Sequence, residues 1–304
     1  PADRGMIKGF LINRFRGDPA LFDEGRRQIA RRTGWSDLGL VPWLSAAACL
    51  PAEDAVVVER GRGCFPCGRA RIVAPRWRTL ANFDDFDPLT ADPAVTFAFV
   101  PPGRPLPADA DLIVLPGSKA TLSDLAMMRS EGWDIDLKAH VRRGGRVLGL
   151  CGGYQMLGRR IADPLGIEGA PGSAEGLGLL DVETTLGAVK TLRPAAGRLV
   201  PGGQAVSGYE IHVGETRGPA TARPFLVHAD GRPDGAVSPD GRIAGTYLHG
   251  LFGCGEARAA ILGPLGAASD AGDHADRVEA ALDDIAGVLA RSLDIDAIAG
   301  IAGL

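Results

Sequence analysis

The sequence has few aromatic residues, few cysteines and no excess of basic side chains. Of its 304 residues, 6% are aromatic and five are cysteines, and 33 Lys and Arg residues against 37 Asp and Glu residues give a net charge of −4. Proteins that bind nucleic acid usually carry a basic excess or stripe, so we expect no nucleic-acid partner. No apolar run approaches the roughly 18 residues that a membrane-spanning helix needs, so we expect no membrane partner.

The cysteines predict neither a disulfide framework nor a zinc site. An odd number of them favours a reducing compartment, and we expect a cytoplasmic protein. Cys64 and Cys67 form a C-x-x-C pair, but the sequence offers neither a second pair nor closely spaced histidines to complete a zinc site. We interpret this pair as an incidental loop feature and expect no bound metal. Cys49 and Cys254 are expected to fill small apolar spaces.

Short apolar strands alternating with helices predict an α/β fold with two sheets. The expected strands are residues 6–15 (buried), 39–42, 70–73, 95–100, 111–116, 146–150 and 242–247. The expected helices are residues 19–34, 120–143 in two pieces, 153–161 and about 274–291. A Gly-, Arg- and Pro-rich stretch at 60–70 indicates a linker, and residues 177–228 favour antiparallel strands.

The sharpest local motif is Gly149-Leu150-Cys151-Gly152-Gly153, where an expected strand runs through a tight turn into a helix. This is the pattern of a nucleophile elbow, with Cys in place of Ser. Glycines beside the nucleophile avoid Cβ clashes in the turn, and the start of the helix favours the thiolate form. The N–H group of Gly152 is placed to stabilise an oxyanion. The alternative is a buried structural cysteine at a strand end.

A nucleophilic cysteine needs a base, and His249 is the best candidate because it follows an expected strand and precedes Gly250. A purely structural histidine is the alternative, and no carboxylate that would complete a triad is evident. The segment Leu115–Lys119 also follows an expected strand, but it does not fit the phosphate-loop pattern G-x-x-x-x-G-K-[ST], which occurs nowhere in the chain. We expect Gly117 to supply a second oxyanion N–H group instead.

The segment Ser207–His212 lies between these two candidates in the chain. In a strand, Tyr209 and Ile211 share one face and Glu210 and His212 share the other. The face with Glu210 and His212 either contacts a ligand or is solvated, and the pattern leaves both interpretations open.

Several longer motifs resemble class I glutamine amidotransferases. The general ones are LPGSK at 115–119, GLCGGYQMLG at 149–158, SGYEIHVG at 207–214 and GTYLHGLF at 245–252. Further segments narrow the resemblance to the cobyric acid synthase branch: KGFLINRFRGDPALF at 8–22, GLVPWL at 39–44, LPAED at 50–54 and ANFDDFDPL at 81–89. LPAED and NFDDFDPL favour this branch over cobyrinic acid a,c-diamide synthases and over amidotransferase subunits that act on cell-wall precursors. The resemblance implies a flavodoxin-like α/β domain.

The resemblance also implies a reaction. Cys151 attacks the carboxamide of glutamine, Gly117 and Gly152 hold the oxyanion, and His249 moves the proton, after which water hydrolyses the thioester. The ammonia passes to a second site, where ATP with Mg²⁺ activates the b, d, e and g propionates of adenosylcobyrinic acid a,c-diamide. Gln155 is implied to help bind glutamine. Three further candidates for substrate binding are Tyr209, Glu210 and His212.

The sequence departs from the family pattern at one position beside the candidate base. Most class I amidotransferases have Glu two residues after the catalytic histidine, and here that position is Leu251. The resemblance therefore leaves open which residue orients His249, and Glu210 is a candidate substitute. A catalytically idle binding module is the remaining alternative, and the presence of both Cys151 and His249 argues against it.

The absence of a phosphate loop is a larger departure, because the family's ATP-dependent amidoligase domain begins with one. We therefore expect residues 1–68 to be the C-terminal remnant of that domain, with Asn13 where related ATPases contact the adenine base. Residues 69–304 are expected to form the amidotransferase domain with a C-terminal helix. A C-terminal fragment of this kind would hydrolyse glutamine without amidating a substrate.

Overall fold

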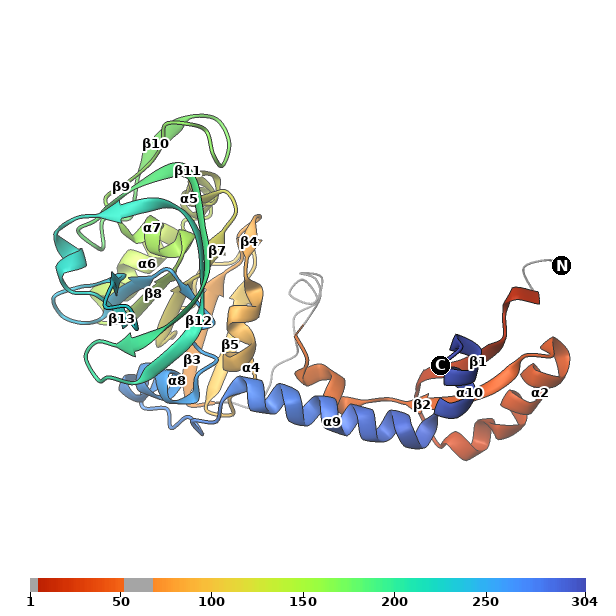
Figure 1. Cartoon of the computed structure of the whole chain (residues 1–304). Helices are drawn as coiled ribbons and strands as arrows, with labels where there is room; N and C mark the ends of the chain where they lie inside the picture. Colours follow the sequence, from red (N-terminus) through yellow and green to blue (C-terminus); the bar gives the residue numbers. More distant parts are fainter. Residues whose placement is uncertain (1–4, 52–67) are drawn as a thin grey trace. The chain divides into compact units, whose positions relative to one another are not determined.

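The structure, a computed structural model, describes residues 5–51 and 68–304, so Cys64 and Cys67 lie outside the described residues (Figure 1). The chain divides into two compact units, one of residues 1–51 with 275–304 and one of residues 52–274. We expected a boundary at residue 68, with the C-terminal helix in the second domain. In the structure, residues 275–304 make their contacts with residues 1–51 and belong to the first unit. Within the described residues, no helix is both long and apolar enough to cross a membrane.

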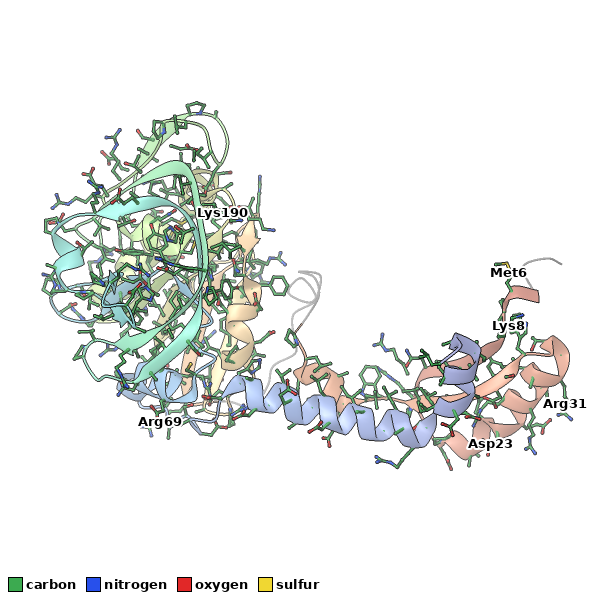
Figure 2. The ribbon with its side chains drawn as sticks, viewed as in Figure 1. Met6, Lys8, Asp23, Arg31, Arg69 and Lys190 are labelled. Atoms are coloured by element: carbon green, nitrogen blue, oxygen red, sulfur yellow. The ribbon has the colours of Figure 1, made fainter. Side chains whose placement is uncertain are left out.

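The first unit is a parallel β-α-β arrangement with two further helices. It contains β1 (Gly9–Phe15), the 3-10 turn η1 (Pro19–Phe22), α2 (Asp23–Thr33), β2 (Ser36–Pro42), the 3-10 turn η2 (Ser45–Cys49), α9 (His274–Ser292) and α10 (Ile295–Ala302). Asp23 in the first turn of α2 and Arg31 in its last turn complement the helix dipole (Figure 2). The N–H group of Asp294 donates to the carbonyl of Leu38 at 3.0 Å, which ties the C-terminal segment to β2.

Three expectations for the first unit need correction. Every side chain of β1 is at least partly exposed, so the expected buried strand at 6–15 is wrong in its burial, because a two-stranded sheet offers few covering neighbours. Cys49 is exposed at the end of η2 rather than filling an apolar space, while Cys254 does pack against the apolar core of the second unit. Helix α10 was not predicted. It begins at Ile295, with only two residues between it and the end of α9 at Ser292, so the sequence offers little loop to mark a separate helix.

The second unit is built on a six-stranded sheet in the order β15-β16-β8-β6-β3-β5. The strands are β3 (Ala70–Pro75), β5 (Val95–Val100), β6 (Leu112–Leu115), β8 (Arg146–Leu150), β15 (Ala236–Val237) and β16 (Ile243–Thr246). Five of them run parallel, and β15 is an antiparallel edge strand. Counted along the chain, the parallel strands have the order 2-1-3-4-5 of the flavodoxin-like fold, which confirms the expected fold class.

Helices cover both faces of this sheet (Figure 1). The elements are α4 (Asp87–Thr90), α5 (Thr121–Ser130), α6 (Trp133–Arg142), α7 (Gly152–Leu157) and α8 (Gly255–Leu262). Ile113 and Leu115 of β6 pack with residues of α5, α6 and α7, whereas Leu112 and Val114 pack with residues of α4 and α8. Because successive strand side chains point to opposite faces, one short apolar strand contributes to two cores. The helix expected at 120–143 in two pieces is confirmed, with its break at Gly132.

A second, mostly antiparallel sheet adjoins the carboxyl ends of the parallel strands. Its strands are β9 (Arg160–Asp163), β10 (Gly172–Glu175), β11 (Glu183–Leu199), β12 (Ala205–Arg217), β13 (Leu226–His228), β14 (Pro233–Asp234) and β17 (Leu248–His249). β17 follows β16 after a single residue, so the chain passes directly from one sheet to the other. The expectation of antiparallel strands is confirmed. The helix expected over 153–161 is too long, because α7 ends at Leu157 and β9 begins at Arg160.

Three smaller elements lie at the same end of the sheet or on its flank. β4 (Leu80–Ala81) pairs antiparallel with β7 (Gly117–Ser118), directly after β6, and the 3-10 turn η3 (Phe83–Phe86) follows β4. The remaining 3-10 turns are η4 (Pro219–Ala222) and η5 (Gly263–Leu265). Open α/β sheets bind ligands at the carboxyl ends of their parallel strands, so we expect the functional site at this end of the sheet.

Candidate active site

Cys151 occupies the sharp turn between β8 and α7. Its backbone has φ 49° and ψ −109°, a combination that non-glycine residues adopt at a cost in strain. The neighbouring glycines allow this turn: a Cβ on Gly153 would overlap the carbonyl oxygen of Leu115, and one on Gly149 would lie 2.6 Å from the backbone nitrogen of Tyr154. The predicted elbow is therefore present as a local structure.

The thiol of Cys151 is half-buried and faces the second sheet. Its Sγ donates to the carbonyl oxygen of Ile211 on β12 at 3.3 Å. Two residues earlier on the same strand, Tyr209 is paired in register with His249 of β17. Strand β12 thus brings the candidate nucleophile and the candidate base to the same place.

His249 is held by a carboxylate that the sequence did not identify. Its Nδ1 lies 2.6 Å from Oδ2 of Asp85, and the other oxygen of Asp85 accepts the N–H group of Gly250 at 2.7 Å. His249 is 1% exposed and Asp85 is 4% exposed, so water does not screen the pair. Asp85 lies in η3, within the NFDDFDPL segment. The two adjacent aspartates of that motif were the only sequence signal, and they do not show which one turns inward.

The surroundings of His249 stabilise its protonated form. Burial alone would lower its pKa, but the charge of Asp85 and its hydrogen bond to the ring, with a smaller contribution from the Cys151 side chain, outweigh burial and raise the pKa to about 10. Within the described residues, its Nε2 makes no hydrogen bond of ordinary geometry, although the Cys151 side chain is close enough to raise the pKa of the ring. An imidazolium with one nitrogen held and the other unengaged is arranged to donate a proton to a bound molecule.

Tyr209 forms one wall around the imidazole. Its ring stacks on His249 with centroids 5.3 Å apart and an angle of 17° between the planes. Its hydroxyl oxygen accepts a hydrogen bond from Nδ2 of Asn82 at 2.6 Å. Burial, together with the charge of Asp85, raises the pKa of Tyr209 to about 12, so the phenol stays neutral. The loop after β4 therefore holds both Tyr209, through Asn82, and His249, through Asp85.

The two predicted oxyanion residues lie next to these side chains. A Cβ on Gly117 would be 3.4 Å from Cε1 of His249, and one on Gly152 would be 3.0 Å from the backbone nitrogen of Ser118. The first N–H groups of a helix have no partner within the helix, and Gly152 is the first residue of α7. Gly117, Gly152, Cys151 and His249 are thus brought together at the carboxyl ends of β6 and β8.

Gln155 and His212 surround the hydroxyl of Tyr247 rather than the thiol. The buried amide nitrogen of Gln155 donates to Tyr247 at 3.2 Å and to the carbonyl of Val213 at 3.1 Å, and its oxygen accepts from Thr121 at 3.3 Å. His212 stacks on Tyr247 at 3.9 Å between centroids, and burial lowers its pKa. Both side chains therefore contact Tyr247, and the lowered pKa keeps His212 neutral at pH 7.

Glu210, the candidate substitute for the missing glutamate, takes another place. Its side chain is 3% exposed and forms ion pairs with Arg193 and, at 3.3 Å, with Arg232, and its Oε1 lies 3.2 Å from Nε2 of His228. Burial opposes its ionisation, but the hydrogen bond from Arg193 and the nearby positive charges outweigh burial and lower its pKa. Glu210 is neither solvated nor bonded to His249, so the residue that orients the base is Asp85.

One group of buried side chains has the composition of a metal site. Candidate ligand atoms of Glu210, His228 and Asp234 lie within 4.8 Å of one another. However, Arg193 and Arg232 both pair with Glu210, and Asp234 is held by the Thr246 hydroxyl and the Tyr247 N–H group while burial raises its pKa. A divalent cation would therefore add positive charge in a buried place where two guanidinium groups already face one carboxylate. The arrangement is an ion-pair network on the second sheet rather than a cation site.

The comparisons with known proteins agree with this geometry. A family model described as a CobB/CobQ-like glutamine amidotransferase domain matches residues 71–257. The cobyric acid synthase of Caulobacter sp. (strain K31) is 64% identical over 303 residues, which cover 100% of this chain and 62% of that protein. The cobyric acid synthase of Paracoccus denitrificans (strain Pd 1222) is 59% identical over 302 residues, 99% of this chain and 62% of that protein. The chain therefore spans about three fifths of the length of these relatives.

Proposed function

The chain belongs to the CobB/CobQ-like glutamine amidotransferase family, and we propose that its second unit hydrolyses glutamine and releases ammonia. The observation that carries the proposal is the buried Asp85–His249 pair beside the strained elbow of Cys151. A thiol nucleophile, a proton-carrying imidazole and a carboxylate that orients it are the parts that acyl transfer requires.

The reaction follows from the positions of these groups. The Cys151 thiolate attacks the carboxamide carbon of glutamine, and the carbonyl becomes an oxyanion beside the N–H groups of Gly117 and Gly152. His249, protonated at neutral pH, gives its proton to the nitrogen, and the C–N bond breaks to release ammonia. Water then attacks the γ-glutamyl thioester with His249 as base, which frees glutamate and the thiol. Asp85 touches no reacting atom in this scheme and acts as a positioning residue.

We propose further that the ammonia is used to amidate the b, d, e and g propionates of adenosylcobyrinic acid a,c-diamide. The support is the name of the relatives, cobyric acid synthase, and their 59–64% identity over almost the whole chain. In this proposal the first unit, residues 1–51 with 275–304, belongs to the ATP-dependent part of the enzyme. The corrinoid and glutamine are then the substrates, and ATP with Mg²⁺ activates the carboxylates.

The described residues of the first unit do not themselves fit an ATP site. The side-chain oxygen of Asn13 accepts the N–H group of Arg14 at 2.8 Å, and the guanidinium groups of Arg14 and Arg16 lie over the ring of Trp43 at 5.0 and 4.1 Å. No phosphate loop is present in the sequence to hold the nucleotide. The chemistry assigned to this chain therefore ends with the release of ammonia.

The test of the proposed function is glutamate release from glutamine by the full chain. We expect wild-type protein to release glutamate and Cys151→Ala to release none, while Cys254→Ala keeps the wild-type rate. A glutamine-like diazoketone should label Cys151 before Cys49 and Cys254, as peptide mapping would show. Glutamate release that survives in Cys151→Ala would show that Cys151 is not the nucleophile.

A further inference from the structure

A carboxylate from a distant loop reaches the edge of the candidate active site. Glu168 lies between β9 and β10, and its Oε2 accepts the backbone N–H group of Thr121 at 2.5 Å. Thr121 is the first residue of α5 and follows shortly after the β7 strand that contains Gly117. The contact joins segments that are 47 residues apart in the sequence.

Thr121 connects Glu168 to the elbow. The hydroxyl of Thr121 donates to the amide oxygen of Gln155 on α7 at 3.3 Å. A Cβ on Gly152, the residue after the nucleophile, would lie 3.2 Å from the same hydroxyl oxygen. Thr121 is therefore the only residue between Glu168 and Gly152, the candidate oxyanion residue, along this chain of contacts.

The turn before Glu168 fixes its direction. Both oxygens of the buried Asp163 carboxylate accept backbone N–H groups, from Ile167 at 2.8 Å and from Glu168 at 3.0 Å. Gly166 has φ +68°, in the left-handed region that favours glycine. Because the turn is closed by its own hydrogen bonds, it presents the Glu168 side chain inward without help from a ligand.

The Glu168 carboxylate has no ion-pair partner in the part of the chain that the structure describes. Within the described residues, no Lys, Arg or His forms an ion pair with it, and it is half-buried. Burial raises its pKa, and the nearby acidic groups, Asp163 and Asp124, raise it further, whereas the hydrogen bond from the Thr121 N–H group lowers it. A half-buried carboxylate among other carboxylates is costly unless a cation arrives to balance it.

We propose that the Glu168 carboxylate receives the α-ammonium group of the glutamine that reacts at Cys151. Glutamine differs from a simple primary amide in the ammonium and carboxylate groups on its α-carbon, so a selective site needs an anion for the ammonium. Gln155 and His212 offer no negative charge. Of the nearby carboxylates, Asp163 is occupied by the N–H groups of its own turn, and Asp124 is fully buried and accepts the hydroxyls of Thr79 and Ser118. The inference rests on the proposed function, since it identifies how the same site recognises its substrate.

Binding to a protein without the nucleophile tests the proposal. We would titrate Cys151→Ala with L-glutamine and with glutaramate, which has the same chain and amide but lacks the α-amino group. We expect glutamine to bind at least about 10-fold more tightly, the usual loss when a charged group is left without its hydrogen-bonded partner. In Cys151→Ala with Glu168→Gln, glutamine should bind as weakly as glutaramate, whose own affinity stays unchanged.

A matched control separates the carboxylate from the fold of the loop. Glu175→Gln removes the same charge from an exposed position seven residues further along and should leave the preference for glutamine intact. An unchanged preference in Glu168→Gln, equal weakening of both ligands, or no binding of glutamine to Cys151→Ala would each overturn the proposal. Binding is measured on Cys151→Ala, which cannot react, and glutamate release is measured on the wild-type protein. A wild-type protein that releases no glutamate would contradict the proposed function, whereas the binding result alone decides the role of Glu168.

Discussion

The carboxylate of Asp85 lies 2.6 Å from Nδ1 of His249 and joins two parts of the chain that are 164 residues apart. The other oxygen of Asp85 accepts the N–H group of the next residue, Gly250, so the carboxylate holds both the ring and the main chain of the base. This arrangement leaves Nε2 for the substrate. It also explains how the site works with Leu251 where most class I amidotransferases have a glutamate.

Replacing Asp85 with Asn should reduce the turnover of glutamine while leaving its binding almost unchanged. Asn keeps the size of the side chain but presents an N–H group or a neutral oxygen to the imidazole, which favours the wrong tautomer. In a Ser-His-Asp triad the same change lowers kcat about 10⁴-fold, and we expect a loss of up to that size here. Steady-state measurement of glutamate release should show this loss with KM changed by no more than a few fold.

The neighbouring aspartate provides the control for this experiment. Asp84 is exposed and makes no hydrogen bond to His249, so Asp84→Asn should keep kcat near the wild-type value. Equal losses in Asp84→Asn and Asp85→Asn would show that negative charge on the loop, rather than the oriented contact, supports the reaction.

The rate should fall at alkaline pH when His249 loses its proton. Its pKa is raised to about 10, so the imidazolium is present at neutral pH and disappears as the pH rises through 10. We expect kcat/KM to fall on the alkaline side near that value. In Asp85→Asn the main cause of the raised pKa is absent, and the fall should move toward the ordinary value of about 6.5. A fall at the same pH in both proteins would contradict this assignment.

The contribution of the Asp85–His249 pair to folding stability should also decrease as the pH rises. The pKa of His249 is higher in the folded chain than in the unfolded chain, so the pair stabilises the fold fully below about pH 6.5. That contribution is lost as the pH rises toward 10. The difference in unfolding free energy between wild type and Asp85→Asn should therefore shrink from pH 6 to pH 10, as denaturant titrations at several pH values would measure.

The parts of the site predicted from sequence are those fixed by local rules. The turn at Cys151 needs glycines at set positions, and a short apolar strand before a glycine turn identifies β8 without knowledge of the rest of the fold. Asp85 was out of reach because its role arises only when η3 packs against β17. The end of α7 is also set by a contact with a distant residue. A Cβ on Gly158 would lie 2.7 Å from the carbonyl oxygen of Val182, so only glycine fits where the helix stops.

Gly208 should be needed for the position of His249. A Cβ at Gly208 would overlap the carbonyl oxygen of His249 on the neighbouring strand, so Gly208→Ala must push β17 away. A displacement of about 1 Å at a reacting group costs on the order of 100-fold in rate. We expect a loss of this size in kcat for glutamate release. Gly187→Ala is the control, because a Cβ there meets open space and the rate should not change.

The ion pairs around Glu210 should stabilise the second sheet. Glu210→Gln removes the charge that faces Arg193, Arg232 and His228. Breaking a fully buried ion pair costs about 3–5 kcal/mol, but both arginines are more than 40% exposed and regain water, so we expect a loss of about 1–3 kcal/mol. Chemical denaturation of both proteins would measure it, and a variant as stable as wild type would show that the pairs contribute little.

Removal of metal should not affect this network. Arg193 and Arg232 already pair with Glu210, and Thr246 and Tyr247 already donate to Asp234, so no divalent cation is required to hold these carboxylates in place. We expect EDTA to leave the melting temperature of the chain unchanged and added Zn²⁺ to leave it unraised. A melting temperature that falls with EDTA in wild type but not in Glu210→Gln would show that Glu210, His228 and Asp234 bind a metal ion. In that case the charge balance drawn from Arg193 and Arg232 would be wrong, because a ligating Glu210 would have to release at least one of them.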